Sequence, residues 1–211
     1  MSEFLEKVKE ARSKAKPRKF MQTWDFSVNV KNMDLKKPEN RLNVEFVLPE
    51  GRGKDLKVAV IADSLAAEAR KLADLVITKE EIEEIAKNRK RLKKIANDYD
   101  RFLGEASVMP MVGKSFGMVL GQKGKMPKPM PPKIKIESLI EAARKTVKIS
   151  LKESPVIHVS VGTDSMPDEK VAANAEAVFN FLKERLPKGN NNIRSAYIKL
   201  SMGQPVKIRT D

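Results

Sequence analysis

The chain changes character at LKVAVIA, residues 56–62, where six of the seven residues are apolar. An apolar run of this kind, without regular alternation, is typical of a strand that is covered on both faces, as in a parallel sheet. The sequence after it predicts helix 65–73, strand 74–78, helix 79–97, strand 101–106, helix 114–120 and helix 136–144. Strands that alternate with helices indicate βαβ units. We therefore predict an α/β domain with a parallel sheet around this run.

One segment of this domain is dense in residues that dictate backbone shape. It reads GKSFGMVLGQKGKMPKPMPPK, residues 113–133, and holds four of the chain's ten glycines, prolines at 127, 129, 131 and 132, and no acidic residue. Proline fixes φ and pushes its predecessor toward extended conformations, whereas glycine permits conformations that other residues avoid. The segment predicts a helix followed by a rigid, cationic, exposed loop.

The sequences on both sides of this domain alternate between apolar and polar residues. In residues 24–31, for example, Trp24, Phe26, Val28 and Val30 share one face. Similar half-buried strands are predicted at 43–48, 146–152, 156–161 and 193–202, the last with Met202 on its apolar face. Amphipathic helices are predicted at 2–13 and after Pro167. This pattern predicts an α+β domain whose sheet has one open face.

The simplest architecture is an insertion, in which one domain is built from both ends of the chain and the other interrupts it. We predict an outer domain of residues 1–62 and 145–211 and an inner domain of residues 63–144. Two chain crossings would join them, and a paired crossing is a natural hinge. The expected fold class is α/β: an α+β outer domain interrupted by an α/β domain.

The charge balance points to a polyanionic partner. The chain has 42 lysines and arginines against 28 acidic residues, a net charge of +14. Proteins this basic most often bind nucleic acid, and less often an acidic membrane surface. We expect no membrane partner, because no basic helix has a strong apolar face and no apolar run approaches the roughly 20 residues of a membrane span. The N-terminal segment lacks the apolar core of an export signal.

Metal and thiol chemistry have little support in the composition. The absence of cysteine excludes disulfides, thiolate catalysis and cysteine-based zinc sites, and the single histidine, His158, excludes a multi-histidine site. We expect neither a metal nor a cofactor. His158, on the open face of its strand, is either a surface residue, an RNA hydrogen-bonder or, with a distant carboxylate to orient it, a general base.

Two glycine–lysine pairs match phosphate-binding loops only in part. Gly113-Lys114-Ser115 has Val108 where the first glycine is required, and Gly124-Lys125 has Val119 there and Met126 in place of the serine or threonine. A nucleotide-dependent enzyme on the inner domain is nevertheless the main alternative function.

The open face of the outer sheet combines hydroxyl and amide groups with lysines. Hydroxyls bond the 2′-OH and phosphate groups of RNA, and lysines neutralise phosphates. Only Tyr197 is aromatic on that face, which argues against base stacking and favours recognition of a folded RNA by shape. An ordinary solvated face is the alternative. Before the first strand, the cations Lys14, Lys16, Arg18 and Lys19 are either a solvated charge run or phosphate contacts.

Three motifs resemble one known family. Residues 120–129, LGQKGKMPKP, look like the signature loop of the large-subunit ribosomal protein one family, the proteins of the mobile ribosomal stalk. Residues 35–41 and 48–53, LKKPENR and LPEGRG, look like its archaeal and eukaryotic branch, and residues 201–208, SMGQPVKI, like its C-terminal motif. The resemblance covers nearly the whole chain in order, including the insertion.

The resemblance implies an outer domain with an inserted Rossmann-like domain, and binding to a folded region of large-subunit ribosomal RNA mainly through the outer domain. It also implies repression of the protein's own mRNA and help in moving deacylated tRNA out of the exit site. The implied RNA-facing residues are Phe20, Thr23, Asp25, Ser195, Ser201, Met202 and Gly203, to which we add Lys19 and His158. We expect a secondary RNA contact or an interdomain contact at Gly121, Lys123, Gly124 and Lys125.

Two departures from the family pattern bear on these expectations. The signature loop commonly reads Gly-Pro-Arg-Gly, and Lys123 keeps the charge of that arginine but lacks its planar fork. Ser201 stands where threonine is usual and keeps the hydroxyl. We predict a non-enzymatic, cytoplasmic, ribosome-associated protein that is monomeric outside the ribosome.

Overall fold

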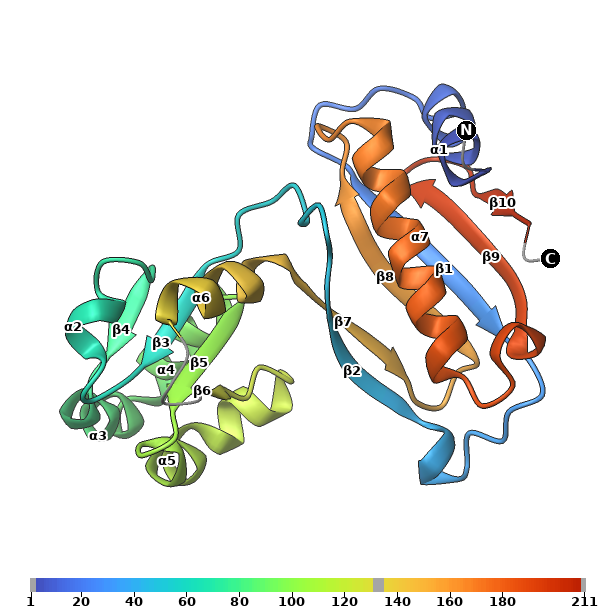
Figure 1. Cartoon of the computed structure of the whole chain (residues 1–211). Helices are drawn as coiled ribbons and strands as arrows, with labels where there is room; N and C mark the ends of the chain where they lie inside the picture. The colour runs from blue at the N-terminus through green and yellow to red at the C-terminus, as the bar shows by residue number, and fades with distance from the viewer. Residues whose placement is uncertain (1–2, 131–134, 210–211) are drawn as a thin grey trace. The chain divides into compact units, whose positions relative to one another are not determined.

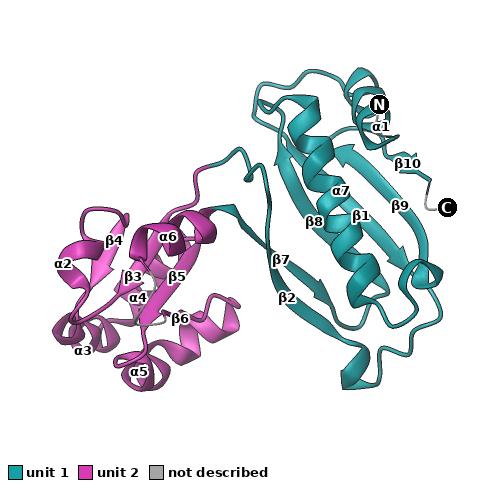
Figure 2. Cartoon of the chain, viewed as in Figure 1, with its two compact units in different colours: residues 1–54, 145–211 teal, residues 55–144 magenta. Residues whose placement is uncertain are grey.

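The computed structural model describes residues 3–130 and 135–209. It divides into two compact units: unit 1 comprises residues 1–54 and 145–211, and unit 2 comprises residues 55–144 (Figure 2). The first crossing comes after Lys54 rather than after Ala62, where we placed it, because the strand at 58–61 pairs with strands of unit 2. The second crossing follows Arg144. Antiparallel and parallel sheets occur together with helices, which confirms the predicted α/β fold class.

Unit 2 is built on a four-stranded parallel sheet in the order β4-β3-β5-β6 (Figure 1). Its strands are β3 Val58–Ile61, β4 Leu75–Ile77, β5 Arg101–Glu105 and β6 Lys128–Met130. Its helices are α2 Ala66–Ala69, α3 Lys79–Lys87, α4 Arg89–Asp98, α5 Met109–Gln122 and α6 Ile136–Lys145.

The central strand β3 is buried on both faces. Ala59 and Ile61 belong to a hydrophobic cluster with residues of α3, α4 and α5. Val58 and Val60 belong to a second cluster, with residues of α2 and α6. The uninterrupted apolar run of β3 is thus explained by helices on both sides of the sheet.

Several elements of unit 2 differ from those predicted. The helix expected at 79–97 is two helices, because the Asn88 side chain accepts the Arg91 N–H at 3.1 Å and caps the start of α4. The helix expected at 65–73 is the short α2, and α5 begins earlier than expected. The proline-rich loop contains β6, which tolerates Pro129 because it is an edge strand. Pro131 and Pro132 lie outside the described residues.

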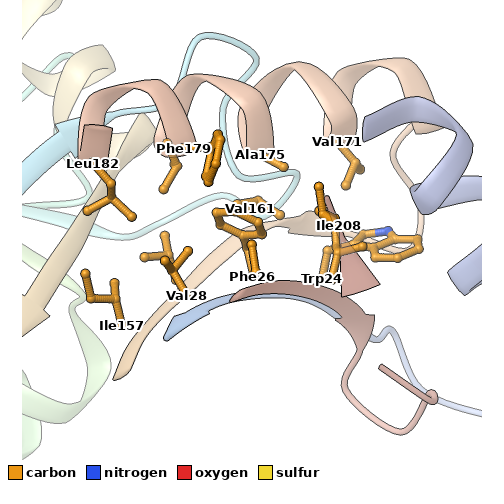
Figure 3. Packing of buried hydrophobic residues seen from close by; sticks show 14 of the residues in the cluster. Trp24, Phe26, Val28, Ile157, Val161, Val171, Ala175, Phe179, Leu182 and Ile208 are labelled. Carbon is orange, nitrogen blue, oxygen red and sulfur yellow. The ribbon is translucent and has the colours of Figure 1, made fainter. Parts of the chain in front are cut away.

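Unit 1 is built on a four-stranded antiparallel sheet in the order β10-β9-β1-β8. Its strands are β1 Thr23–Val30, β8 Val156–Thr163, β9 Ile193–Leu200 and the unpredicted β10 Val206–Ile208. Trp24, Phe26 and Val28 of β1 are fully buried, as their alternation predicts. Helices α1 (Glu3–Ser13) and α7 (Asp168–Arg185) supply the other side of this core, and Figure 3 shows α7 residues such as Phe179 above the strands.

The strands predicted at 43–48 and 146–152 do not join this sheet. They are β2 (Leu42–Val47) and β7 (Thr146–Leu151), which pair with each other in a separate two-stranded antiparallel sheet. Two short 3₁₀ helices, η1 (Pro38–Asn40) and η2 (Gly189–Asn192), complete the described elements of unit 1.

The last long strand, β9, ends two residues earlier than predicted, at Leu200. Our prediction that Met202 lies on the apolar face is wrong, because its side chain is 58% exposed. The chain leaves the sheet where the Gly203 N–H donates to the Leu200 carbonyl at 2.8 Å and closes a turn. In the described part of the chain, no helix combines the length and apolarity needed to cross a membrane.

Candidate nucleic-acid interface

The start of β1 and the end of β9 lie side by side, although 178 positions separate Thr23 from Ser201. The Ser201 N–H donates to the Thr23 carbonyl at 3.0 Å, and the Ser201 hydroxyl lies 3.2 Å from both the N–H and the carbonyl of Thr23. We name the surface formed by residues 20–25 and 201–203 the β1–β9 junction. It brings together Phe20, Thr23, Asp25, Ser201, Met202 and Gly203 of the predicted RNA-facing residues.

Gln22 fixes the junction from within. Its side chain is 2% exposed, and its Oε1 accepts the Met202 N–H at 3.1 Å. Its carbonyl accepts the Asp164 N–H at 2.9 Å, which ties the start of β1 to the connection after β8. The sequence analysis missed Gln22, because a buried amide before a strand carries no periodic signal.

Three large apolar side chains of the junction are exposed to solvent. Phe20 is 55%, Met21 is 62% and Met202 is 58% exposed. Among the described residues of unit 1, Val47 is the only other large apolar side chain so exposed. Grouped exposed apolar side chains mark interaction surfaces. The sequence analysis missed Met21, whose signal is its place beside Phe20, outside the apolar stripe of any predicted element.

The middle of the open face carries titratable groups from three strands. Asp25 on β1 lies opposite Ser160 on β8 and Lys199 on β9. Burial raises the pKa of the Asp25 carboxyl, although the charges of Lys199 and His158 act to lower it. His158 is exposed, and its Nδ1 lies 2.9 Å from the Ser27 hydroxyl. These groups continue the polar surface from the junction along the sheet.

Ser195 lies at the other end of the same face, and the structure does not bring it to the junction. It pairs with Asn29, which is about 20 Å from Thr23 at the usual rise of a strand. Ser195 is only 7% exposed, and its hydroxyl accepts the Asn29 amide N–H at 2.9 Å. It lines an open hollow of about 400 Å³ together with Asn29, Val30, Pro155, Val156, Arg194 and Tyr197.

The cationic segment before β1 is anchored at its start by Arg12. The Arg12 guanidinium donates to the carboxylates of Asp164 and Asp168, each at 2.7 Å, and to the carbonyls of Asp164 and Met166, each at 3.0 Å. It also lies 5.4 Å from the ring centroid of Trp24. These contacts hold the end of α1 against the loop that precedes α7. The segment that follows leads to the junction and exposes Lys14, Lys16, Arg18 and Lys19.

The signature loop lies in unit 2, where it ends α5. Gly124 has a φ of +64°, and the N–H groups of Gly124 and Lys125 donate to the carbonyls of Gly121 and Leu120, each at 2.9 Å. A residue with positive φ at the end of a helix is usually glycine, because other side chains clash there. Gly124 therefore has a structural role in this loop.

The two lysines of the loop are engaged at the end of α4. The Lys125 ammonium donates to the carbonyls of Ala96 at 3.0 Å and Tyr99 at 2.7 Å. Lys123 donates to the side chain of Asn97. Cations at the C-terminus of a helix are stabilised by the helix dipole. The expected RNA or interdomain contact of this loop stays a prediction.

At the carboxyl ends of β3 and β5, where parallel sheets usually bind ligands, hydrogen-bond donors are bonded to a carboxylate of the protein itself. In the order β4-β3-β5-β6 the strand order reverses between β3 and β5, and ligands of such sheets bind at the carboxyl ends of these strands. There, Glu105 accepts the Asp63 N–H at 2.9 Å and the hydroxyls of Ser64 at 2.8 Å and Ser107 at 2.9 Å. Burial acts to raise the pKa of Glu105, but these bonds and one from the Leu65 N–H outweigh it, so the pKa is lowered.

Neither glycine–lysine pair forms a phosphate-binding loop. Gly113, Lys114 and Ser115 lie inside α5, whereas a phosphate loop precedes its helix. Gly124 and Lys125 follow a helix rather than a strand. In residues 3–130 and 135–209, no group of three or more His, Cys, Asp or Glu side chains is arranged to hold a metal ion.

The chain matches known proteins over almost its whole length. A sequence model of the Ribosomal protein L1p/L10e family matches residues 9–204. Large ribosomal subunit protein uL1 of Methanothermobacter thermautotrophicus is 49% identical over 208 residues, which cover 98% of each chain. The protein of that name from Pyrococcus horikoshii is 50% identical over 206 residues, 97% of this chain and 94% of the relative. These matches confirm the resemblance indicated by the three motifs: the chain belongs to the ribosomal protein L1p/L10e family.

Proposed function

We propose that this protein is a structural constituent of the large ribosomal subunit and binds a folded segment of large-subunit ribosomal RNA through the β1–β9 junction. Membership of the family supports the structural role, because the relatives are large ribosomal subunit proteins. The observation that carries the site is the grouping of exposed Phe20, Met21 and Met202 beside the hydrogen-bonded pair Thr23 and Ser201.

The junction offers RNA several kinds of contact. The exposed apolar side chains pack against sugar and base surfaces. The hydroxyls of Thr23 and Ser201 bond 2′-OH and phosphate groups, and a 2′-OH contact distinguishes RNA from DNA. Gly203 lets the turn after β9 pack closely, since a Cβ there would lie 3.3 Å from the Cβ of Leu200. Lys16, Arg18 and Lys19 add affinity by releasing counterions from phosphates.

This surface suits a folded RNA better than an unpaired strand. Proteins that read single strands stack successive bases on several aromatic side chains. The junction has only one solvent-exposed aromatic residue, Phe20, among residues 20–25 and 201–203. Its hydroxyl, backbone and apolar groups instead fit the shape and sugar edges of a rigid RNA.

Two finer roles follow from the same surface. An mRNA segment that folds like the ribosomal site would compete for the junction, so the free, monomeric protein would repress translation of its own mRNA in the cytoplasm. Bound in the mobile stalk of the ribosome, the protein would assist the release of deacylated tRNA from the exit site. Competition binding between the stalk RNA and the leader of its own mRNA tests the first role, and tRNA release from ribosomes lacking the protein tests the second.

The direct test of the site compares two exposed methionines. Met202→Asp places a negative charge in the junction and is expected to weaken binding to a stalk RNA fragment at least roughly tenfold, because it repels phosphates and removes an apolar contact. Met118→Asp makes the same change on α5 of unit 2, where the side chain is 63% exposed, and is expected to leave specific binding unchanged. Equal affinities of the two variants would contradict the site, provided that both remain folded by circular dichroism.

The alternative, a nucleotide-dependent enzyme on unit 2, has less support. Glu105 already accepts the donors that a ligand phosphate would need at the carboxyl ends of β3 and β5. A rise in melting temperature with ATP, GTP or a dinucleotide would favour the enzyme. Indifference to nucleotides together with tight, salt-sensitive RNA binding supports the proposal.

A further inference from the structure

A dense cationic segment lies in unit 2. It reads KNRKRLKK at residues 87–94, with six basic residues in eight positions and no acidic residue. All six basic residues are exposed: Lys87 is the last residue of α3, and the other five lie on α4. Leu92 and Ala96 of α4 are buried in the core of unit 2. Helix α4 thus buries its apolar side and presents its cations to solvent. We name this set the α4 surface: Lys87, Arg89, Lys90, Arg91, Lys93 and Lys94.

The cations of the α4 surface have no ion-pair partner among the residues that the structure describes. In the part of the chain that the structure describes, no ion pair or side-chain hydrogen bond involves any of the six side chains. Arg89 and Lys93 are neighbours one helical turn apart, as are Lys90 and Lys94, and like charges at this spacing destabilise a helix.

The position of these charges along α4 is also unfavourable. The first turn of α4 contains no acidic residue, although the helix dipole favours negative charge there. Asp98, the last residue, is the only acidic residue of the helix. Departures from such local rules are expected at functional sites, where a partner offsets their cost.

The signature loop reinforces this surface at the other end of the helix. The Lys125 ammonium donates to the carbonyls of Ala96 and Tyr99, so a cation lies at the negative end of the helix dipole. Lys123 is exposed and donates to Asn97, beside the last turn. The cations of α4 itself end at Lys94, and its last turn ends with the exposed Asp98, so beside that turn the positive charge comes from Lys123 and Lys125 of the loop.

We infer that the α4 surface is a second RNA-binding surface, which binds the phosphate backbone of double-helical RNA without reading its sequence. This inference rests on the proposed function in one respect: together they give the protein two RNA-binding surfaces, one on each unit. A membrane partner is disfavoured because the apolar residues of α4 are buried and unavailable for insertion. Stacking of unpaired bases is disfavoured because residues 87–98 include no aromatic side chain.

The test measures how the affinity for RNA depends on salt. The full-length protein is titrated with a random-sequence RNA duplex of about 20 base pairs at several KCl concentrations, because the slope of log affinity against log salt counts the phosphates neutralised. Arg89→Gln/Lys93→Gln is expected to flatten that slope by about two and to lower the low-salt affinity on the order of tenfold. Its melting temperature without RNA is expected to stay the same or rise, because like charges are removed.

The matched control is Arg70→Gln/Lys71→Gln. It removes one arginine and one lysine from exposed positions of the same unit. These positions adjoin α2, which packs on the opposite face of the parallel sheet from α4. The control is expected to keep the slope and affinity of the unmodified protein. Equal slopes for both double variants would overturn the inference and would leave an acidic protein as the partner of α4.

A stalk RNA fragment separates this inference from the proposed function. Met202→Asp is expected to abolish the preference for the stalk fragment over the random duplex, whereas Arg89→Gln/Lys93→Gln is expected to weaken both complexes and keep the preference. If the unmodified protein shows no preference for the stalk fragment while the two double variants differ in slope, the proposed function fails and the α4 inference stands.

Discussion

The two main sheets of this protein use apolar side chains in different ways. β1 buries every second residue and leaves Thr23, Asp25, Ser27 and Asn29 partly exposed on an open face. β3 buries all of its residues between two layers of helices. A parallel sheet covered in this way can offer a ligand only its strand ends and edges. The unit whose strands alternate therefore has a whole sheet face available for a partner, and the unit with continuous strands does not.

The two units also differ in the groups that they offer to an anionic partner such as RNA. Unit 1 combines exposed apolar groups with the Ser201 hydroxyl, which bonds the backbone of Thr23 across the β1–β9 junction. In unit 2, the Glu105 carboxylate accepts the Asp63 N–H and the Ser64 hydroxyl at the strand ends. The densest group of exposed cations in the described part of unit 2 lies instead at the α4 surface. The surface of unit 1 is therefore suited to recognising the shape of a folded RNA. The surface of unit 2 is suited to binding phosphates by charge alone.

The largest expected change in stability comes from placing a charge in the sealed sheet of unit 2, compared with the same change on the open sheet of unit 1. Val60→Asp and Ala59→Asp put a carboxylate on opposite faces of β3, and each is expected to cost at least about 4 kcal/mol of the free energy of unfolding, because neither face is solvated. Ser27→Asp, on the open face of β1, is expected to cost less than about 0.5 kcal/mol. Urea denaturation followed by circular dichroism measures all three. A stable Ala59→Asp protein would show that helices do not seal that face.

The two motif glycines separate folding from binding. Gly124→Ala is expected to destabilise unit 2 by about 1 kcal/mol, because alanine is strained at the positive φ of this position, and to leave the affinity for RNA unchanged. Gly203→Ala is expected to weaken binding to the stalk RNA while changing stability less. Urea denaturation and RNA titration of both variants check this, and a reversed pattern would contradict the assigned roles.

The crevice carboxylate predicts a pH-dependent loss of stability. Glu105→Gln is expected to lower the free energy of unfolding by about 1 kcal/mol at neutral pH, because hydrogen bonds to a charged acceptor are lost at a partly solvated site. The folded-state pKa of Glu105 lies below its unfolded value, so its contribution is present above the unfolded pKa and is lost as the pH falls through the folded pKa. Urea midpoints of both proteins should therefore converge in acid. A constant difference would argue against a role for the charge.

The smallest effect is expected at Asp25, and it has the opposite sign. Burial raises the folded-state pKa of this carboxyl, so the ionised form is disfavoured by folding, and stability is lost as the pH rises through the folded pKa. Asp25→Asn is therefore expected to be slightly more stable than the unmodified protein at neutral pH, by less than about 0.5 kcal/mol, and to lose that advantage in acid. Thermal melting of both proteins from neutral pH into acid measures the difference in stability.

Much of the fold was predictable because the spacing of apolar residues along a strand is a local property of the sequence. The period of two in β1 and the continuous run of β3 each reflect what covers the strand, so they identified the open face, the sealed sheet and the insertion. The family motifs are local as well, and the resemblance that they indicate predicts Phe20, Thr23 and Met202 as RNA-facing residues. A dense cationic run such as residues 87–94 is also plain in the sequence, although charge alone does not say whether an ion pair balances it.

Tertiary structure decided what depends on long-range pairing. Only the pairing of β1 with β9 shows that Thr23 and Ser201 form one surface, that Gln22 supports it and that Met202 is exposed. The same pairing shows that Ser195 is covered by Asn29 at the far end of the face. The alternation of β2 and β7 is like that of β1, yet they form a sheet of their own. A strand's period specifies which of its faces is buried, whereas its partner is chosen by hydrogen bonds between residues far apart in the chain.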